Sequence, residues 1–125
     1  MANQAISTTV DGYFAMWNET DHARRQAVIA ATWSDDPRYV DPLVAAQGAD
    51  GLHAIVAGVH EQFPGHQFRL MGPVDSHHDR ARWDWELVAP DTGQAIARGV
   101  DFAIITSDGR LSTVTGFLDQ IPVAP

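Results

Sequence analysis

Two aspartates of this chain stand where a carboxyl group could act as an acid or a base. Asp41 follows Tyr39 and Val40, an aromatic and a β-branched residue that favour a strand. It precedes Pro42, which excludes helical geometry at Asp41. Asp41 is therefore fixed at the end of a short strand. It is either a turn former or an acid or base at the mouth of a pocket, and both interpretations stay open.

Asp101 lies inside a predicted strand, between Val100 and Phe102. Aspartate is depleted in strand interiors, so its presence there calls for a reason. By the alternation of a strand, Asp101 shares a face with Gly99 and Ala103, which are small enough to leave the space that a cavity needs. The alternative is a solvated aspartate on an exposed face.

A strand predicted over residues 80–88 has one aromatic face and one charged face. The faces comprise Trp83, Trp85 and Leu87 on one side, and Arg82, Asp84 and Glu86 on the other. By default the tryptophans point at the helices as core or pocket wall. If the charged face points inward instead, Arg82 and Asp84 line the cavity, and the tryptophan face needs a partner subunit to cover it.

Other catalytic chemistries lack their motifs. The six histidines include no His-Glu-x-x-His spacing, and the chain has no cysteine, so we expect no metal site. A Gly-x-Ser-x-Gly turn, a P-loop and a dinucleotide fingerprint are absent too, so no cofactor is expected. His60 falls between Val56 and Phe63 on a predicted helix face, as a core-edge residue or a residue of the pocket lining.

The elements that must position these residues follow from hydrophobic periodicity. An amphipathic helix over residues 6–17 buries Tyr13, and a second helix spans residues 22–32. Asp50 caps a third helix that runs to Phe63, where Pro64 and Gly65 end it. Strands follow over 67–74, 80–88, 94–106 and 110–118, separated by turn residues. The sequence therefore predicts one α+β domain over residues 1–125.

The charge of the chain restricts its partners. Sixteen acids and eight arginines give a formal net charge of −8. Such a surface repels nucleic acid and anionic lipid, while small hydrophobic ligands remain open. We find no apolar run near the roughly 18 residues of a membrane span, no leader and no cysteine, so we expect a soluble cytoplasmic protein.

Four segments, residues 12–17, 39–42, 99–102 and 108–111, resemble the nuclear transport factor 2-like superfamily. The resemblance extends from Val10 to Asp119 and is strongest to its SnoaL-like polyketide cyclase and ketosteroid isomerase branch. It implies a cone-shaped α+β barrel, with three N-terminal helices packed on a curved, mostly antiparallel sheet around a deep pocket. It also implies a homodimer.

The ketosteroid isomerase pattern assigns roles to three residues. Asp41 matches the general base, which moves a proton next to a carbonyl group. Tyr13 and a protonated Asp101 match the groups that hold the enolate oxygen. The predicted substrate contacts are Trp17, Tyr39, His60, Phe63, Phe68, Arg82 and Asp84. The function expected is a cofactor-free isomerase or cyclase that binds a small hydrophobic carbonyl compound.

Three alternatives remain. A limonene epoxide hydrolase overlay places Arg82 and Asp84 in the site, but the carboxylate that this family needs on the last strand falls at Gly116. A binding protein without turnover would pair Asp101 with an internal arginine such as Arg82. A pure dimerisation module would have its interior filled by aromatic side chains.

Overall fold

The structure is a computed structural model that describes residues 2–120. Three helices and six strands follow one another along the described chain. The helices are α1 (Ala2–Asn18), α2 (His22–Thr32) and α3 (Gly48–Gln62). The strands are β1 (Trp33–Val40), β2 (Ala45–Gln47), β3 (Gln67–His77), β4 (Arg80–Val88), β5 (Ala95–Ile105) and β6 (Leu111–Gln120).

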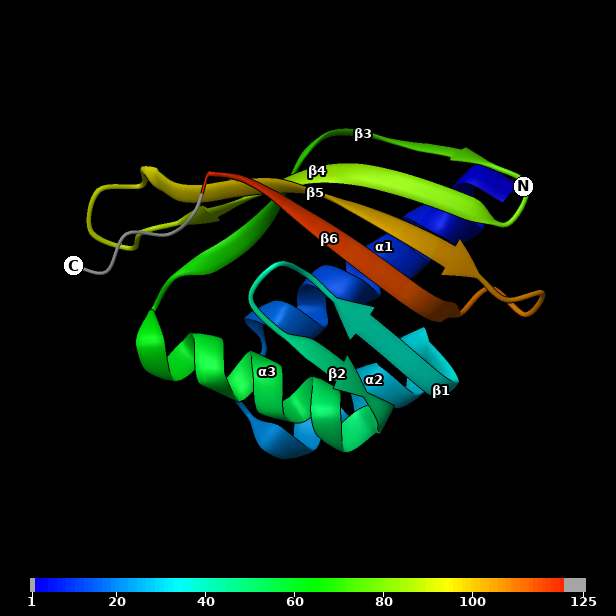
Figure 1. The fold of residues 1–125 in the computed structure, drawn as a ribbon, viewed down its shortest axis with the longest axis horizontal. Coiled ribbons are helices and arrows are strands. Elements are labelled where there is room, and N and C mark those ends of the chain that lie inside the picture. Colours follow the sequence, from blue (N-terminus) through cyan, green and yellow to red (C-terminus); the bar gives the residue numbers. More distant parts are fainter. Residues whose placement is uncertain (1, 121–125) are drawn as a thin grey trace.

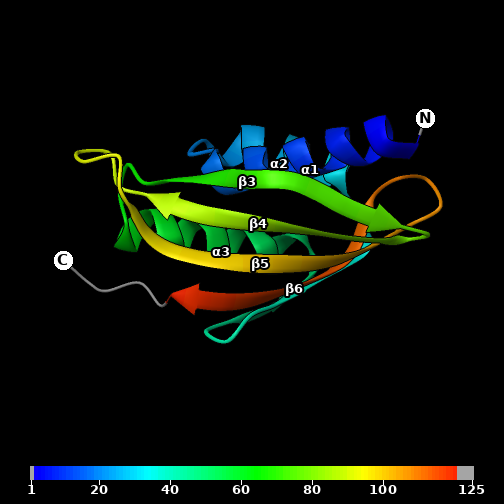
Figure 2. The ribbon, with the colours of Figure 1, turned by 90° about the horizontal axis from the view of Figure 1, so that it is seen from above.

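All six strands form one sheet in the order β2-β1-β6-β5-β4-β3. Only the β1–β6 pair is parallel; the other neighbours are antiparallel. The sheet curves over the helices, which gather on its concave side (Figures 1 and 2). It is mixed and not closed, because β2 and β3 form free edges. The predicted α+β fold with three helices on a curved sheet is therefore confirmed.

Local polar contacts explain where the first two helices begin and end. The Asp21 carboxylate caps α2 by accepting a hydrogen bond from the Arg24 amide at 2.8 Å. The guanidinium of buried Arg25 donates to the Glu19 carbonyl oxygen at 2.8 Å, which fixes the turn between α1 and α2. The Asn18 side chain exchanges two hydrogen bonds with the backbone of Phe68, at 2.9 and 2.8 Å. The end of α1 is thereby fixed to β3.

Several predicted boundaries change because tertiary pairing extends the strands. β1 begins at Trp33, directly after α2, and β2 forms in a segment for which no element was predicted, since Arg38 pairs with Gln47 across the two strands. Gln47 rather than Asp50 occupies the N-cap position of α3, without a capping hydrogen bond from its side chain, and Asp50 lies in the first turn. β3 runs to His77, beyond the predicted end at residue 74, and Gly72, with a φ of 76°, lies in a bulge between Met71 and Asp75 in the register with β4.

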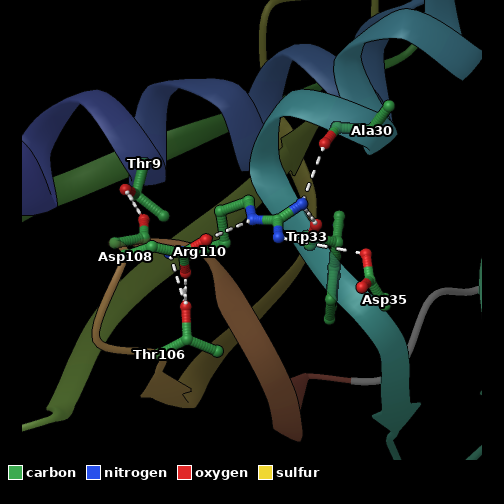
Figure 3. A network of polar contacts seen from close by, with 8 residues as sticks. Thr9, Ala30, Trp33, Asp35, Thr106, Asp108 and Arg110 are labelled. Carbon is green, nitrogen blue, oxygen red and sulfur yellow. Dashed lines mark hydrogen bonds and ion pairs between the residues drawn. The ribbon is translucent and has the colours of Figure 1, made fainter.

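Arg110, at the start of β6, connects the helical layer to the sheet (Figure 3). Its guanidinium donates to the carbonyl oxygen of Trp33 at 3.2 Å and to that of Ala30 at 3.5 Å. It also donates to the Asp108 carboxylate at 3.0 Å. The other labelled partners in this network are Thr9, Asp35 and Thr106. The junction of α2 and β1 is thus held against the β5–β6 turn.

The orientation of β4 follows the default interpretation. Trp83, Trp85 and Leu87 are buried against the helices, whereas Arg82 and Asp84 are exposed on the convex face. The tryptophan face is therefore covered within the chain and needs no partner subunit. Of the charged residues on β4, only Glu86 is buried, between the guanidinium groups of Arg69 and Arg98.

Candidate functional site

A cavity of about 370 Å³ lies between the helices and the concave face of the sheet. Its wall is mainly apolar and aromatic, and its side chains with polar atoms are two phenols, two carboxyl groups, one amide and two indoles. No basic side chain lines it within the described chain. The lining comprises Tyr13, Phe14, Trp17, Tyr39, Asp41, Leu43, Val44, Ala54, Ile55, Gly58, Val59, Gln62, Phe63, Phe68, Trp85, Leu87, Ala97, Asp101 and Leu118.

Two phenol–carboxyl pairs stand in this wall. The Tyr13 hydroxyl, from α1, donates to Oδ2 of Asp101 on β5 at 2.8 Å. The Tyr39 hydroxyl, from β1, donates to Oδ2 of Asp41 at 2.7 Å. The two pairs are close enough to interact electrostatically, because the negative charge of Asp41 helps to raise the pKa of Asp101. The predicted catalytic residues Tyr13, Asp41 and Asp101 therefore meet in one cavity.

Asp101 is only 3% exposed, and burial raises its pKa from an ordinary 3.8 to about 7. The Tyr13 hydrogen bond partly offsets this rise, as do the indole N–H groups of Trp85 and Trp83. Those indoles make no hydrogen bond of ordinary geometry, and Oδ1 of Asp101 is buried without a hydrogen-bond partner among the described residues. No arginine pairs with Asp101, unlike in the predicted non-catalytic alternative.

The two phenols are held in their neutral form. Burial, and then the nearby Asp101 carboxylate, raises the pKa of both Tyr13 and Tyr39 above the ordinary value of 10. Each hydroxyl therefore keeps its proton and serves as a hydrogen-bond donor to its carboxyl partner. The Tyr13 ring is fixed by edge contacts with Trp83 at 5.2 Å and Phe14 at 5.7 Å between ring centroids.

Asp41 is held by its own turn as well as by Tyr39. Its Oδ1 accepts the backbone amides of Leu43 and Val44 at 2.8 and 2.9 Å, and its own amide donates to the Val44 carbonyl oxygen. Asp41 is thus a turn former, as one interpretation predicted, and its carboxyl group also lies in the cavity wall, as an acid or base there would require. Leu43 is 62% exposed and also lines the cavity, which places this turn at the rim.

Two glycines shape the surroundings of Asp101. The space beside Gly99, which the sequence suggested as part of a cavity, is filled: a Cβ there would lie 2.6 Å from the Trp85 ring and 2.3 Å from the Phe117 carbonyl oxygen. Gly116 pairs with Asp101 across β5 and β6. A Cβ at Gly116 would lie 2.9 Å from Oδ1 of Asp101 and 3.3 Å from the Tyr39 hydroxyl.

Most predicted substrate contacts do line the cavity, and three do not. Trp17, Tyr39, Phe63 and Phe68 belong to the wall. His60 lies behind it instead: its Nε2 donates to the carbonyl oxygen of Trp17 at 2.6 Å, because that oxygen can only accept.

Arg82 and Asp84 lie on the convex face, outside the cavity, and Arg82 pairs with Asp75 at 3.1 Å. The assignment of these two residues to substrate binding is corrected, and so is that of His60. Alternation along β4 explains the first correction, because the face that carries Trp83 and Trp85 is the one that meets the helices.

The sequence analysis missed several lining residues. Leu43 and Val44 belong to a segment for which no element was predicted, although two apolar residues directly after Asp41-Pro42 were a usable signal. Leu118 shares the inward face of β6 with Gly116, a pattern that alternation from Val114 could have given.

The sequence profile of the SnoaL-like domain family matches residues 10–114, which is most of the chain. The chain belongs to the SnoaL-like family. A solved structure from Agrobacterium tumefaciens, a proposed isomerase of the SnoaL-like family, is 37% identical and superimposes with a TM-score of 0.87. The alignment covers 93% of this chain and 98% of that one.

More distant structures share the fold. A proposed SnoaL-like polyketide cyclase from Jannaschia is 20% identical, with a TM-score of 0.74 over 94% of this chain and 87% of that one. A protein of unknown function with a cystatin-like fold, from Methylobium petroleophilum, is 16% identical, with a TM-score of 0.76 over 97% of this chain and 80% of that one. Among curated proteins, none matches this sequence. Within residues 2–120, no helix has the length and apolar character to cross a membrane.

Proposed function

We propose that this SnoaL-like protein is an acid–base enzyme that isomerises or cyclises a small hydrophobic carbonyl compound with its own side chains alone. The observation that carries this proposal is that the carboxyl groups of Asp41 and Asp101 line the same apolar cavity. The two carboxyl groups differ in environment: Asp101 is buried with a pKa of about 7, whereas Asp41 lies at the rim and accepts hydrogen bonds from two backbone amides and a phenol. We assign the buried group as the acid and the group at the rim as the base.

The proposed reaction is a proton shuttle. The Asp41 carboxylate removes a proton from the carbon next to the carbonyl group, and the electron pair moves onto the carbonyl oxygen to form an enolate. Neutral Asp101 donates a hydrogen bond to that oxygen. Protonated Asp41 then returns the proton to another carbon, so that the double bond shifts and no proton is gained or lost. In a cyclase, the enolate carbon would instead attack a second carbonyl carbon of the same molecule, the π electrons of that carbonyl would move onto its oxygen, and protonated Asp41 would return its proton to the alkoxide so formed.

In this mechanism Tyr13 supports Asp101 rather than contacting the substrate oxygen. Its hydroxyl proton points at Oδ2 of Asp101. The sequence pattern had assigned both groups to the oxygen, so the unliganded geometry changes the role proposed for Tyr13 to a positioning one.

Two alternatives lose their main requirement. The epoxide hydrolase overlay needed Arg82 and Asp84 in the site, and both are on the convex face. A pure dimerisation module needed a filled interior, whereas the cavity measures about 370 Å³. A cytoplasmic homodimer stays a prediction, which fractionation of cells and sedimentation velocity would test.

The first test follows the isomerisation of 3-cyclohexenone to its conjugated isomer by ultraviolet absorbance. We expect Asp41→Asn to lower kcat/KM by about 10²–10⁴-fold, the usual contribution of a general base. Asp36→Asn is the matched control, because Asp36 lies on β1, the strand that leads into Asp41, and is exposed outside the cavity. Equal rates for the unaltered protein and Asp41→Asn would refute the assignment of the base.

A further inference from the structure

Four glycines lie within the three helices, and the structure gives a reason for three of them. Gly48, the first residue of α3, has a φ of 78°, a value that favours glycine. A Cβ at Gly12 would collide with the side chain of Thr32, and one at Gly51 would lie 3.3 Å from a side chain of β2. A Cβ at Gly58 would meet no described atom within 4 Å. Packing therefore leaves room for a side chain at position 58.

Gly58 lowers the stability of the helix that contains it. It lies in the interior of α3, where glycine is destabilising relative to alanine because it loses more conformational freedom on folding. Its φ is not positive, so alanine would fit both the backbone and the space beside it. Gly58 lines the cavity, and a residue that weakens its own helix without a packing reason indicates that the absent side chain matters to the cavity.

Gly58 lies at the opening of the cavity. Ala54, Gly58 and Gln62 follow one another at intervals of four residues, so they share one face of α3. All three line the cavity and are exposed. Leu43 and Val44, in the turn between β1 and β2, also line the cavity and are exposed. The opening therefore lies between this face of α3 and that turn.

We propose that Gly58 is a specificity-determining residue, because its missing side chain keeps the opening wide enough for a ligand to extend out of the cavity past α3. The part of the ligand in the opening is apolar and uncharged, since it lies between Ala54 on one side and Leu43 and Val44 on the other. The expected ligand is an uncharged carbonyl compound with an apolar extension beyond the part held at Asp41. A larger side chain at position 58 would stand in the way of that extension.

The test compares two saturated ketones with the same polar head, cyclohexanone and 4-phenylcyclohexanone. Neither can isomerise, because neither has a carbon–carbon double bond outside the phenyl ring, so titration followed by NMR measures binding alone. We expect the unaltered protein to bind 4-phenylcyclohexanone at least about tenfold more tightly than cyclohexanone, since the phenyl ring adds apolar contact in the opening.

Gly58→Leu places a branched side chain in the opening. We expect this variant to raise the Kd of 4-phenylcyclohexanone about tenfold and to leave the Kd of cyclohexanone within about twofold of its original value. Ala57→Leu is the matched control, because Ala57 is the adjacent exposed residue of α3 and does not line the cavity. The control should change neither Kd.

Gly58→Ala separates this role from a structural one. Its methyl group meets no neighbouring atom and alanine favours the helix, so the midpoint of thermal unfolding should rise by about 2–5 °C. The same variant should raise the Kd of 4-phenylcyclohexanone about two- to fivefold, because the opening is narrower. A glycine kept for packing would behave differently: Gly12→Ala, whose methyl group would collide with Thr32, should lower the midpoint.

The proposal is overturned if Gly58→Ala lowers the unfolding midpoint, if Gly58→Leu weakens both ketones equally, or if it weakens neither. Failure of the unaltered protein to bind either ketone would overturn it too. It rests on the proposed function only in taking this cavity as the ligand site and a carbonyl compound as the ligand. Since neither probe can react, binding of the ketones without isomerisation of 3-cyclohexenone would remove the proposed function and leave this inference standing.

Discussion

At the scale of single residues, the Tyr13–Asp101 pair sets the chemistry of the cavity. The phenol donates to Oδ2 of Asp101, while Oδ1 is buried without a hydrogen-bond partner among the described residues. Burial alone would raise the pKa of Asp101 further, since the hydrogen bond from Tyr13 counteracts it. Tyr13 therefore lowers the pKa of Asp101, while the Asp101 carboxyl remains the acid.

Removing the Tyr13 hydroxyl should raise the pKa of Asp101. Tyr13→Phe keeps the ring and deletes a hydrogen bond that favours the charged carboxylate, a contribution of about 1.5–3 kcal/mol. We expect the midpoint of the Asp101 titration, followed by carbon NMR of the carboxyl group, to move up by about one to two pH units. Tyr39→Phe, which deletes the bond to Asp41 instead, should move it less. An unchanged or lower midpoint in Tyr13→Phe would contradict this account.

The sequence alone indicated the two aspartates that line the cavity. Asp101 lies inside a predicted strand, where aspartate is rare, and Asp41 is held in extended geometry by Pro42, so both residues stood out without a structure. Arg82 and Asp84 were misplaced because alternation defines two faces without saying which one meets the helices. Leu43 and Val44 were missed although their apolar character was visible, because a turn gains its position from the strands that it joins.

At the scale of elements, the junction between the helical layer and the sheet depends on Arg110. Its guanidinium reaches the end of α2, the first residue of β1 and the β5–β6 turn (Figure 3). A lysine has a single ammonium group and cannot reproduce the fork of donors that these carbonyl oxygens accept. This geometry, rather than the charge, is what the junction requires.

Arg110→Ala should destabilise the fold by about 1–3 kcal/mol, because two carbonyl oxygens and a carboxylate lose their donor. Arg110→Lys should recover less than half of this loss. Urea denaturation measures both variants against Arg80→Ala, whose guanidinium is exposed and pairs with the neighbouring Asp79. We expect that control to stay within about 0.5 kcal/mol of the unaltered protein. A loss in Arg110→Ala no larger than in the control would contradict the bridging role.

The sequence predicted a helix or strand correctly where a long run of residues carries its own hydrophobic pattern. The three helices and the four long strands were recognised, since each carries its own pattern. β2 was missed because three residues have no period and become a strand only by pairing with β1. The parallel pairing of β1 with β6 was not predicted either, because it joins distant parts of the chain.

At the scale of the whole molecule, the buried carboxyl group makes folding stability depend on pH. Asp101 has a pKa of about 7 when folded against 3.8 when exposed, so between these values the folded state holds a proton that the unfolded chain has released. The stability that this group contributes is thus complete below about pH 4 and is lost as the pH rises through 7.

Asp101→Asn should therefore flatten the pH dependence of unfolding. We expect the free energy of unfolding of the unaltered protein, relative to the variant, to fall by about 2–4 kcal/mol between acidic and mildly alkaline pH, at about 1.4 kcal/mol per pKa unit. Urea denaturation of both proteins at each pH gives this difference, and Asp84→Asn serves as the exposed control. A difference that grows toward high pH would show that the sign is wrong.

The parallel pairing of β1 with β6 has a consequence for biosynthesis. β1 carries Tyr39 and leads into Asp41, yet its only long strand neighbour is β6, near the other end of the described chain. During translation, β1 and Asp41 leave the ribosome long before β6, the strand with which β1 pairs. A nascent chain that stops before Leu111 would lack this anchor and the wall beside Asp101. We expect the site to appear only when synthesis has passed β6, because this long-range closure is among the last steps of folding.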